Sequence, residues 1–162
     1  MTDQELRDFA ADHIYYELLM LHETAMGLKW RKDLDSDFAL KNAFIESFTI
    51  HARVLALFLY KGPKWDDDVT AEQYVRDVQK WKAERGDIPA ELQEVIDRTG
   101  KEIAHLTKGR RPPGDPKKGW TIEHVYVLLC KPLHLFLRHA DPARLDVRVP
   151  AFIQELPPGT TT

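Results

Sequence analysis

The stretch FALKNAFIESFTIHARVLALFLY, residues Phe38 to Tyr60, decides the fold. An α-helix turns by about 100° per residue, so side chains three, four and seven positions apart share a face. Apolar side chains then cover nearly the whole circumference of this stretch. A helix that is apolar almost all round is covered by others. We therefore expect it to be the central and most buried helix of an all-α protein.

Glu46, His51 and Arg53 interrupt the apolar surface of this helix. Glu46 and Arg53 fall on one side of it, whereas His51 falls among phenylalanines on the other. Buried charges are usually paired, so one interpretation is that Glu46 and Arg53 bind each other or polar groups of a neighbouring helix. The other interpretation is that Arg53 lines a phosphate-binding groove. We expect His51 to be a hydrogen-bonded core residue, because buried polar groups find partners.

Helical patterns separated by turn signals continue along the rest of the chain. They predict helices at about residues 3–32, 36–60, 70–84, 89–107 and 121–139. Residues 1–140 are therefore expected to form one domain, an antiparallel bundle of four long helices and one short helix. Residues 141–162 are expected to form an extended C-terminal tail that packs on the bundle, with frayed threonines at its end.

The composition is that of a globular protein. The 162 residues are 43% hydrophobic and 30% charged, and the formal net charge of −3 gives no general attraction to nucleic acid or membrane. The single cysteine, Cys130, excludes an internal disulfide and favours a reducing cytoplasm. The first residues lack the pattern of a signal peptide, and no uninterrupted apolar run reaches about 18 residues. We expect a cytoplasmic protein without a membrane span.

The segment DRTGKEIAHLTKGRRPPG, residues 97–114, contains the candidate site. If its first half is helical, Arg98, Lys101 and His105 share one side, opposite an apolar face. One interpretation is an ordinary solvated face with spaced opposite charges, which contribute a few tenths of a kcal/mol. The other is an accessible groove in which these cations meet a ligand.

A basic loop follows that helix. Residues 108–118 contain five cations and one carboxylate, Asp115. Such a loop is suited to holding phosphates by charge and by forked hydrogen bonds, and the neighbouring Trp120 is suited to stacking on a base. A solubilising loop tip is the alternative. The candidate phosphate-binding residues are Lys101, Arg110, Arg111, Lys117 and Lys118.

Metal and cofactor chemistry find little support in the sequence. Glu102 and His105 match the Glu-x-x-His pair of di-iron bundles, but such a site needs a second pair and two further glutamates. Cys130 and His134 supply only two ligands. Glycine-rich phosphate loops and the HExxH and GxSxG motifs do not occur. We expect no metal and no cofactor.

ESFTIHARVLALFLY and GKEIAHLT resemble two segments of a group of small bacterial helical proteins. That group shares a Glu-x4-His-x-Arg-x-Leu helix and a later Lys-x-x-Ala-His-Leu, and its layout is similar to the HEPN superfamily. HEPN domains are helical bundles that often dimerise. Many are metal-independent ribonucleases, whereas others are binding modules. Their signature is an arginine, four to six residues, and a histidine, which Arg98 and His105 match. The arginine is usually followed by a polar residue such as Asn, Asp or His, whereas here it is followed by Thr99.

The resemblance implies two alternative functions. The first is a HEPN-like module of unassigned physiological role that binds nucleic acid, a nucleotide or an unidentified partner protein. The second is a metal-independent ribonuclease, in which His105 acts as general acid or base and Arg98 stabilises charge on the phosphoryl group. A homodimer would then bring two copies of His105 together.

Overall fold

The computed structural model describes residues 1–112, 115 and 119–159. Every element that it assigns there is helical, which confirms the all-α prediction. The α-helices are α1 (Asp3–Phe9), α2 (Tyr15–Trp30), α3 (Phe38–Tyr60), α4 (Val78–Arg85), α5 (Ala90–Arg98), α6 (Ile122–His139) and α7 (Arg148–Glu155). The π segments η1 (Ala10–Ile14) and η4 (Thr99–Ala104) join α1 to α2 and extend α5, and the 3-10 turns are η2 (Lys32–Asp35), η3 (Ala71–Gln73) and η5 (Pro142–Arg144).

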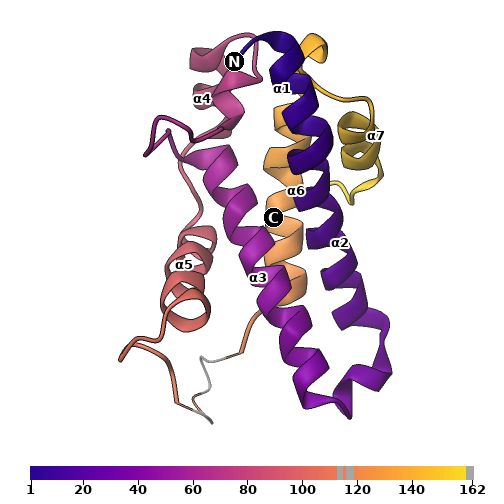
Figure 1. Cartoon of the computed structure of the whole chain (residues 1–162), viewed down its shortest axis with the longest axis vertical. Helices are drawn as coiled ribbons and strands as arrows, with labels where there is room; N and C mark the ends of the chain where they lie inside the picture. Colours follow the sequence, from indigo (N-terminus) through magenta and orange to yellow (C-terminus); the bar gives the residue numbers. More distant parts are fainter. Residues whose placement is uncertain (113–114, 116–118, 160–162) are drawn as a thin grey trace.

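Helix α3 crosses the middle of the molecule (Figure 1). It packs against α2 on one side, α5 on the other and α6 behind. Helix α4 packs against α6 at one end, and α7 covers the outer side of α2 and α6. The arrangement leaves two cavities along α3, one near each of its ends, and these contain the sites considered below.

The short helix begins later than the sequence indicates. The predicted capping box at Thr70 and Gln73 is present, but it closes only the 3-10 turn η3. The next residues are then held away from helical geometry by backbone bonds to the end of α6. Asp141 N–H donates to the Tyr74 carbonyl (2.7 Å), and Arg76 N–H donates to that of His139 (3.1 Å). Asp77 supplies the cap of α4 instead.

The prediction that residues 141–162 form an extended tail is wrong. Residues 148–155 form α7, which buries Val149 and Ile153, and Leu156 is buried just beyond it. These three residues have the spacing of one helical face. Pro150 lies near the start of α7, where its missing N–H breaks no helical bond. The expected packing on the bundle is present, whereas the terminal threonines 160–162 lie outside the described residues.

Helix α3 is central but is not the most buried helix. It buries eight of its 23 residues, all from Phe48 onward, whereas α6 buries eight of 18. The first turns of α3 extend past the bundle with α2, so Phe38 is 84% exposed. Glu46, predicted to be buried, is exposed for the same reason. By length and composition alone α3 could cross a membrane, a test that core helices of soluble proteins also pass.

An aromatic cluster fills the core where α3, α4 and α6 meet. Phe136 makes edge-to-face contacts with Phe58, Tyr74 and Trp81, with centroid separations of 5.4, 6.2 and 6.1 Å. Such pairs add to the stabilisation given by burial alone. The Tyr74 hydroxyl donates to the carbonyl of Leu6 (3.0 Å), which ties α1 to this cluster. The core therefore fixes the end of α3 that carries the larger cavity.

Candidate functional site

The larger cavity lies beside the C-terminal half of α3 and has a volume of about 970 Å3. We call it the Arg53 cavity. Its walls come from the π segment η1, from α3 and from the loop of residues 61–70. The residues used below are Phe9, His13, Glu17, Arg53, Lys61, Lys64, Trp65, Asp67 and Asp68.

Arg53 is the unusual residue of this cavity. Its Nε is buried and has no hydrogen-bond partner among the residues that the structure describes. Glu46 points to solvent instead, and its carboxylate makes no bond among the described residues, so the predicted pairing of Glu46 with Arg53 is wrong. An unmade hydrogen bond at a buried donor costs about 1–3 kcal/mol. The alternative interpretation, that Arg53 lines a groove, therefore agrees with the geometry.

The Glu17 carboxylate, which lines this cavity, already has a partner. His51 is buried, as predicted, and its Nδ1 lies 2.7 Å from Oε2 of Glu17. The ring of His13 packs on Phe9 with a centroid separation of 4.5 Å. Glu17 is therefore held by the histidine and does not bond to Arg53. This leaves the guanidinium of Arg53 available to an anion that enters the cavity.

The π segment η1 brings Phe9, His13 and Glu17 to the cavity. A π-helix inserts an extra residue into an otherwise α-helical run, so the side chains that follow it face a different direction. Such insertions are frequent at functional sites. Residues 3–32 were predicted to be one regular helix, and the sequence alone offers no clear signal for the insertion.

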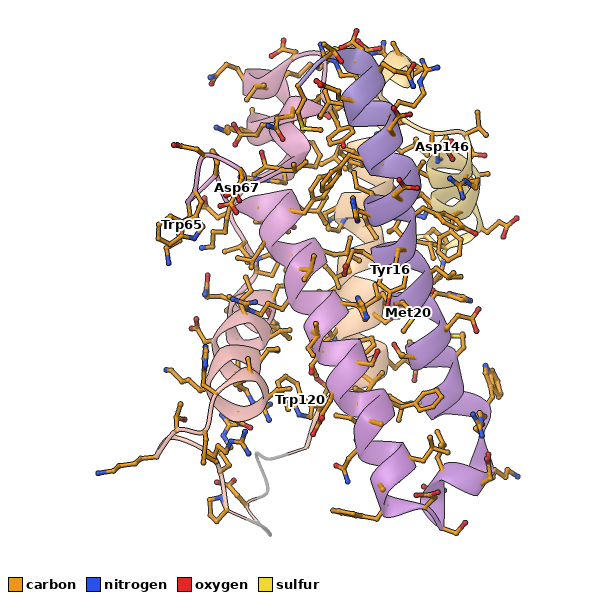
Figure 2. The ribbon with its side chains drawn as sticks, in the orientation of Figure 1. Tyr16, Met20, Trp65, Asp67, Trp120 and Asp146 are labelled. Atoms are coloured by element: carbon orange, nitrogen blue, oxygen red, sulfur yellow. The ribbon has the colours of Figure 1, made fainter. Side chains whose placement is uncertain are left out.

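The loop of residues 61–70 forms the outer wall. The Asp68 carboxylate accepts hydrogen bonds from the backbone N–H groups of Lys64 (2.6 Å) and Trp65 (2.9 Å), which close the loop into a turn. These hydrogen bonds lower the pKa of Asp68, and the bond from the Trp65 backbone has the larger effect. Lys64 lies over one face of the Trp65 ring, which is 64% exposed. Trp65 lies at the outer edge of this loop, and Asp67 lies nearer to the end of α3 (Figure 2).

Arg98 and Trp120 form a different arrangement, beside α5. The Arg98 side chain is 11% exposed, and its Nε and Nη2 donate to the two carboxylate oxygens of Glu102 (3.1 and 3.3 Å). Its guanidinium carbon lies 3.9 Å from the centroid of Trp120. Trp120 was expected to stack on a base, but it stacks on Arg98. The arginine is thus engaged within its own chain.

His105 lies beyond the helix that was predicted to carry it. Residues 99–104 form η4, and His105 follows with extended backbone and an exposed side chain. A π segment turns less per residue than an α-helix, so the predicted alignment of Arg98 and His105 along one α-helical line does not apply. His105 is accessible, as a catalytic histidine requires, and its carbonyl accepts from Nε of Arg110 (3.2 Å).

The predicted phosphate-binding cations are distributed unevenly. Arg110 also donates to the carbonyl of Ile103 (3.3 Å), and Arg111 lies 3.4 Å from Glu94 and 3.5 Å from Glu102. Lys101 is exposed. Lys117 and Lys118 lie outside the described residues. The two arginines thus stabilise the loop against η4 and α5, and the charge of Arg111 is partly neutralised by the two carboxylates.

Among the described residues, no group of three histidine, cysteine, aspartate or glutamate side chains could hold a metal ion. Comparison with protein-family models, curated proteins and solved structures found no match to this chain. The HEPN-like resemblance therefore rests on the sequence segments quoted above. Sequence reasoning singled out Arg53 but missed Phe9, His13, Trp65 and Asp67. The signal that could have found the last two is the loop KGPKWDDD directly after the helix that carries Arg53.

Proposed function

We propose that this chain is a HEPN-like helical module that binds a nucleotide in the Arg53 cavity, with Arg53 holding the phosphate. The observation that carries the proposal is the buried Nε of Arg53, which has no partner. Phosphate oxygens accept forked hydrogen bonds from a guanidinium, and such bonds are stronger than neutral ones. A phosphate would satisfy the one buried donor that the cavity leaves unpaired.

Trp65 and Asp67 are suited to the base. One face of Trp65 is covered by Lys64, and the ring is otherwise exposed. Stacking of a base on an aromatic side chain contributes about 1–3 kcal/mol. The carboxylate of Asp67 has no bonded partner among the described residues, and it can accept from the exocyclic amine of an adenine, guanine or cytosine. An aromatic group and an acceptor at the rim therefore complement the cation inside.

The length of the site also fits a nucleotide. Lys61, where the loop begins, follows Arg53 by eight positions, which span about 12 Å along a helix. A nucleoside monophosphate bridges such a span with its phosphate at one end and its base at the other. Inorganic phosphate would reach Arg53 only and would bind more weakly.

Binding is favoured here over ribonuclease activity because of the state of Arg98. Its guanidinium is occupied by Glu102 and Trp120, and an arginine that stabilises a transition state must be directed at the reacting phosphoryl group. No comparable engagement restrains Arg53. The homodimer expected from the resemblance stays part of the proposal, and sedimentation of the purified chain tests it.

The experiment is calorimetric titration with AMP, adenosine and inorganic phosphate. We expect AMP to bind at least tenfold more tightly than adenosine. In Arg53→Met, AMP should lose that advantage and bind like adenosine. Arg138→Met is the matched control, because Arg138 is an exposed arginine on α6 outside the cavity. Equal AMP affinity in the wild type and in Arg53→Met would contradict the proposal.

A short RNA with a 5′-phosphate tests whether the ligand is a free nucleotide or the phosphorylated end of an RNA. If the physiological ligand is an RNA end, the phosphorylated RNA should bind more tightly than AMP, and the unphosphorylated RNA should not. Incubation of the same RNA in EDTA tests the alternative function. Cleavage that disappears in His105→Ala and persists in Arg53→Met would favour the ribonuclease.

A further inference from the structure

A second cavity of about 540 Å3 lies at the other end of α3. It is enclosed by α2, the first turns of α3 and the start of α6, and we call it the Trp120 cavity. Its inner surface is mainly apolar and includes Met26, Ile45, Trp120, Ile122 and Val127. It shares no lining residue with the Arg53 cavity. This volume and lining are typical of a site for a small apolar ligand.

The polar groups inside the Trp120 cavity already satisfy each other. His22 Nδ1 lies 2.6 Å from the hydroxyl oxygen of Tyr126. Burial raises the pKa of Tyr126, so this hydroxyl stays neutral at physiological pH. A ligand with a polar group at its inner end would have to displace this bond. The inner part of the occupant is therefore apolar.

Two lysines lie at the edge of the Trp120 cavity. Lys29 bonds to Glu123 and Lys41 bonds to Asp35, at 2.7 and 2.6 Å. Their carboxylate partners are 73% and 76% exposed, and ion pairs of this kind contribute little to stability. Glu123 lines the cavity with the two lysines, whereas Asp35, the partner of Lys41, does not. The lysines can exchange their partners for the anionic head of a ligand.

We propose that the Trp120 cavity binds a straight-chain carboxylate, with its alkyl chain against Trp120, Ile45 and Val127 and its carboxylate between Lys29 and Lys41. The inference is independent of the nucleotide proposal. The apolar lining accommodates the chain, the bonded His22 and Tyr126 require no polar group there, and the two lysines fix the position of the head.

Calorimetric titration with octanoate, decanoate and dodecanoate below their micellar concentrations tests the apolar part. Each methylene should tighten binding by about threefold to fourfold. Val127→Phe fills the cavity and should weaken dodecanoate binding at least tenfold, whereas Val147→Phe, on the exposed surface, should not. Thermal melts of both variants show whether each is folded, and Ile122→Phe provides a second filling variant should Val127→Phe be unfolded. Absence of binding, or unchanged binding in the folded filled variant, would overturn the proposal.

Dodecanol, which has the same chain without the charge, tests the head group. The wild type should bind dodecanoate about tenfold more tightly than dodecanol, and Lys29→Gln with Lys41→Gln should remove that difference. The control is Lys32→Gln with Lys108→Gln, two exposed lysines outside the cavity. Equal affinity for acid and alcohol in the wild type would overturn the head-group assignment. Dodecanoate should also bind unchanged to Arg53→Met, which separates this test from that of the nucleotide site.

Discussion

The guanidinium of Arg98 lies between Glu102 and the ring of Trp120, with its carbon 3.9 Å from the ring centroid. Cation–π contacts with a desolvated arginine contribute about 2 kcal/mol, and removal of one member of a buried ion pair costs about 3–5 kcal/mol. We infer that Arg98 links α5 to the start of α6 as a structural residue.

Arg98→Ala should therefore lower the free energy of unfolding by about 3 kcal/mol, because it leaves Glu102 with fewer partners and exposes Trp120. Urea denaturation measures this loss. Lys101→Ala, which changes an exposed cation one turn away, should change stability by less than about 0.5 kcal/mol. An Arg98→Ala variant with unchanged stability would contradict the structural role and favour a catalytic one.

Arg53→Met should raise the free energy of unfolding, whereas Arg98→Ala should lower it. The substitution removes a buried donor without a partner and keeps an apolar stem of similar length, so we expect the ligand-free protein to gain about 1 kcal/mol. Urea unfolding in phosphate-free buffer checks this, with Arg138→Met as the control. A loss of about 3 kcal/mol would indicate that Arg53 is paired after all.

Acid should loosen the loop that carries Trp65. The pKa of Asp68 is lowered by hydrogen bonds from the backbone of Trp65 and Lys64. The stabilisation from a carboxylate with a lowered pKa is present above its unfolded value, near 4, and is lost as pH falls through the folded value. Carbon NMR of the Asp68 carboxyl should show a pKa below that of an aspartate in an unfolded chain.

The matched variants for that titration are Asp68→Asn and Asp66→Asn. Asp68→Asn should loosen the loop at neutral pH, as hydrogen exchange of the Trp65 amide would report. Asp66 makes no bond to the loop backbone among the described residues, so Asp66→Asn should leave that exchange rate unchanged. Equal exchange in the two variants would mean that Asp68 does not hold the loop.

Cys130 should be unreactive in the folded protein. It is fully buried in α6, and burial raises the pKa of its thiol to about 12. The thiolate is the reactive form, so an aromatic disulfide reagent should modify Cys130 only as fast as the chain unfolds. Reaction rates measured across a urea series should follow the unfolded fraction. Rapid modification in native buffer would show that α6 opens locally.

The helical class and the position of the main helices could be predicted because apolar periodicity reports which face of a helix is covered. The short helix was misplaced because the backbone bonds made by Tyr74 and Arg76, which interrupt the helical run, come from the end of α6, more than sixty residues later. Helix α7 was missed because the prolines around it resemble those of an extended tail. Its buried residues, Val149 and Ile153, nevertheless have helical spacing.

The candidate site was harder to predict because its contacts also come from elements far apart in the sequence. The sequence shows that Arg53 lies on an apolar helix, but it does not show whether a partner reaches it from another element. The cations near His105 are conspicuous in sequence, yet Arg98 and Arg111 meet Glu94 and Glu102 in space. Charge counted along a chain is therefore a weaker guide to a site than a buried donor without a partner.

The most direct test of the Arg53 cavity is the proton–nitrogen NMR signal of the Arg53 Nε–H group, assigned by its loss in Arg53→Met. During titration with AMP, this signal should shift progressively and saturate, because the buried donor gains a phosphate acceptor. The Arg138 signal should stay in place, and adenosine should leave the Arg53 signal nearly unchanged. An Arg53 signal that does not move at AMP concentrations that saturate the protein, or a protein that AMP does not saturate, would contradict the account.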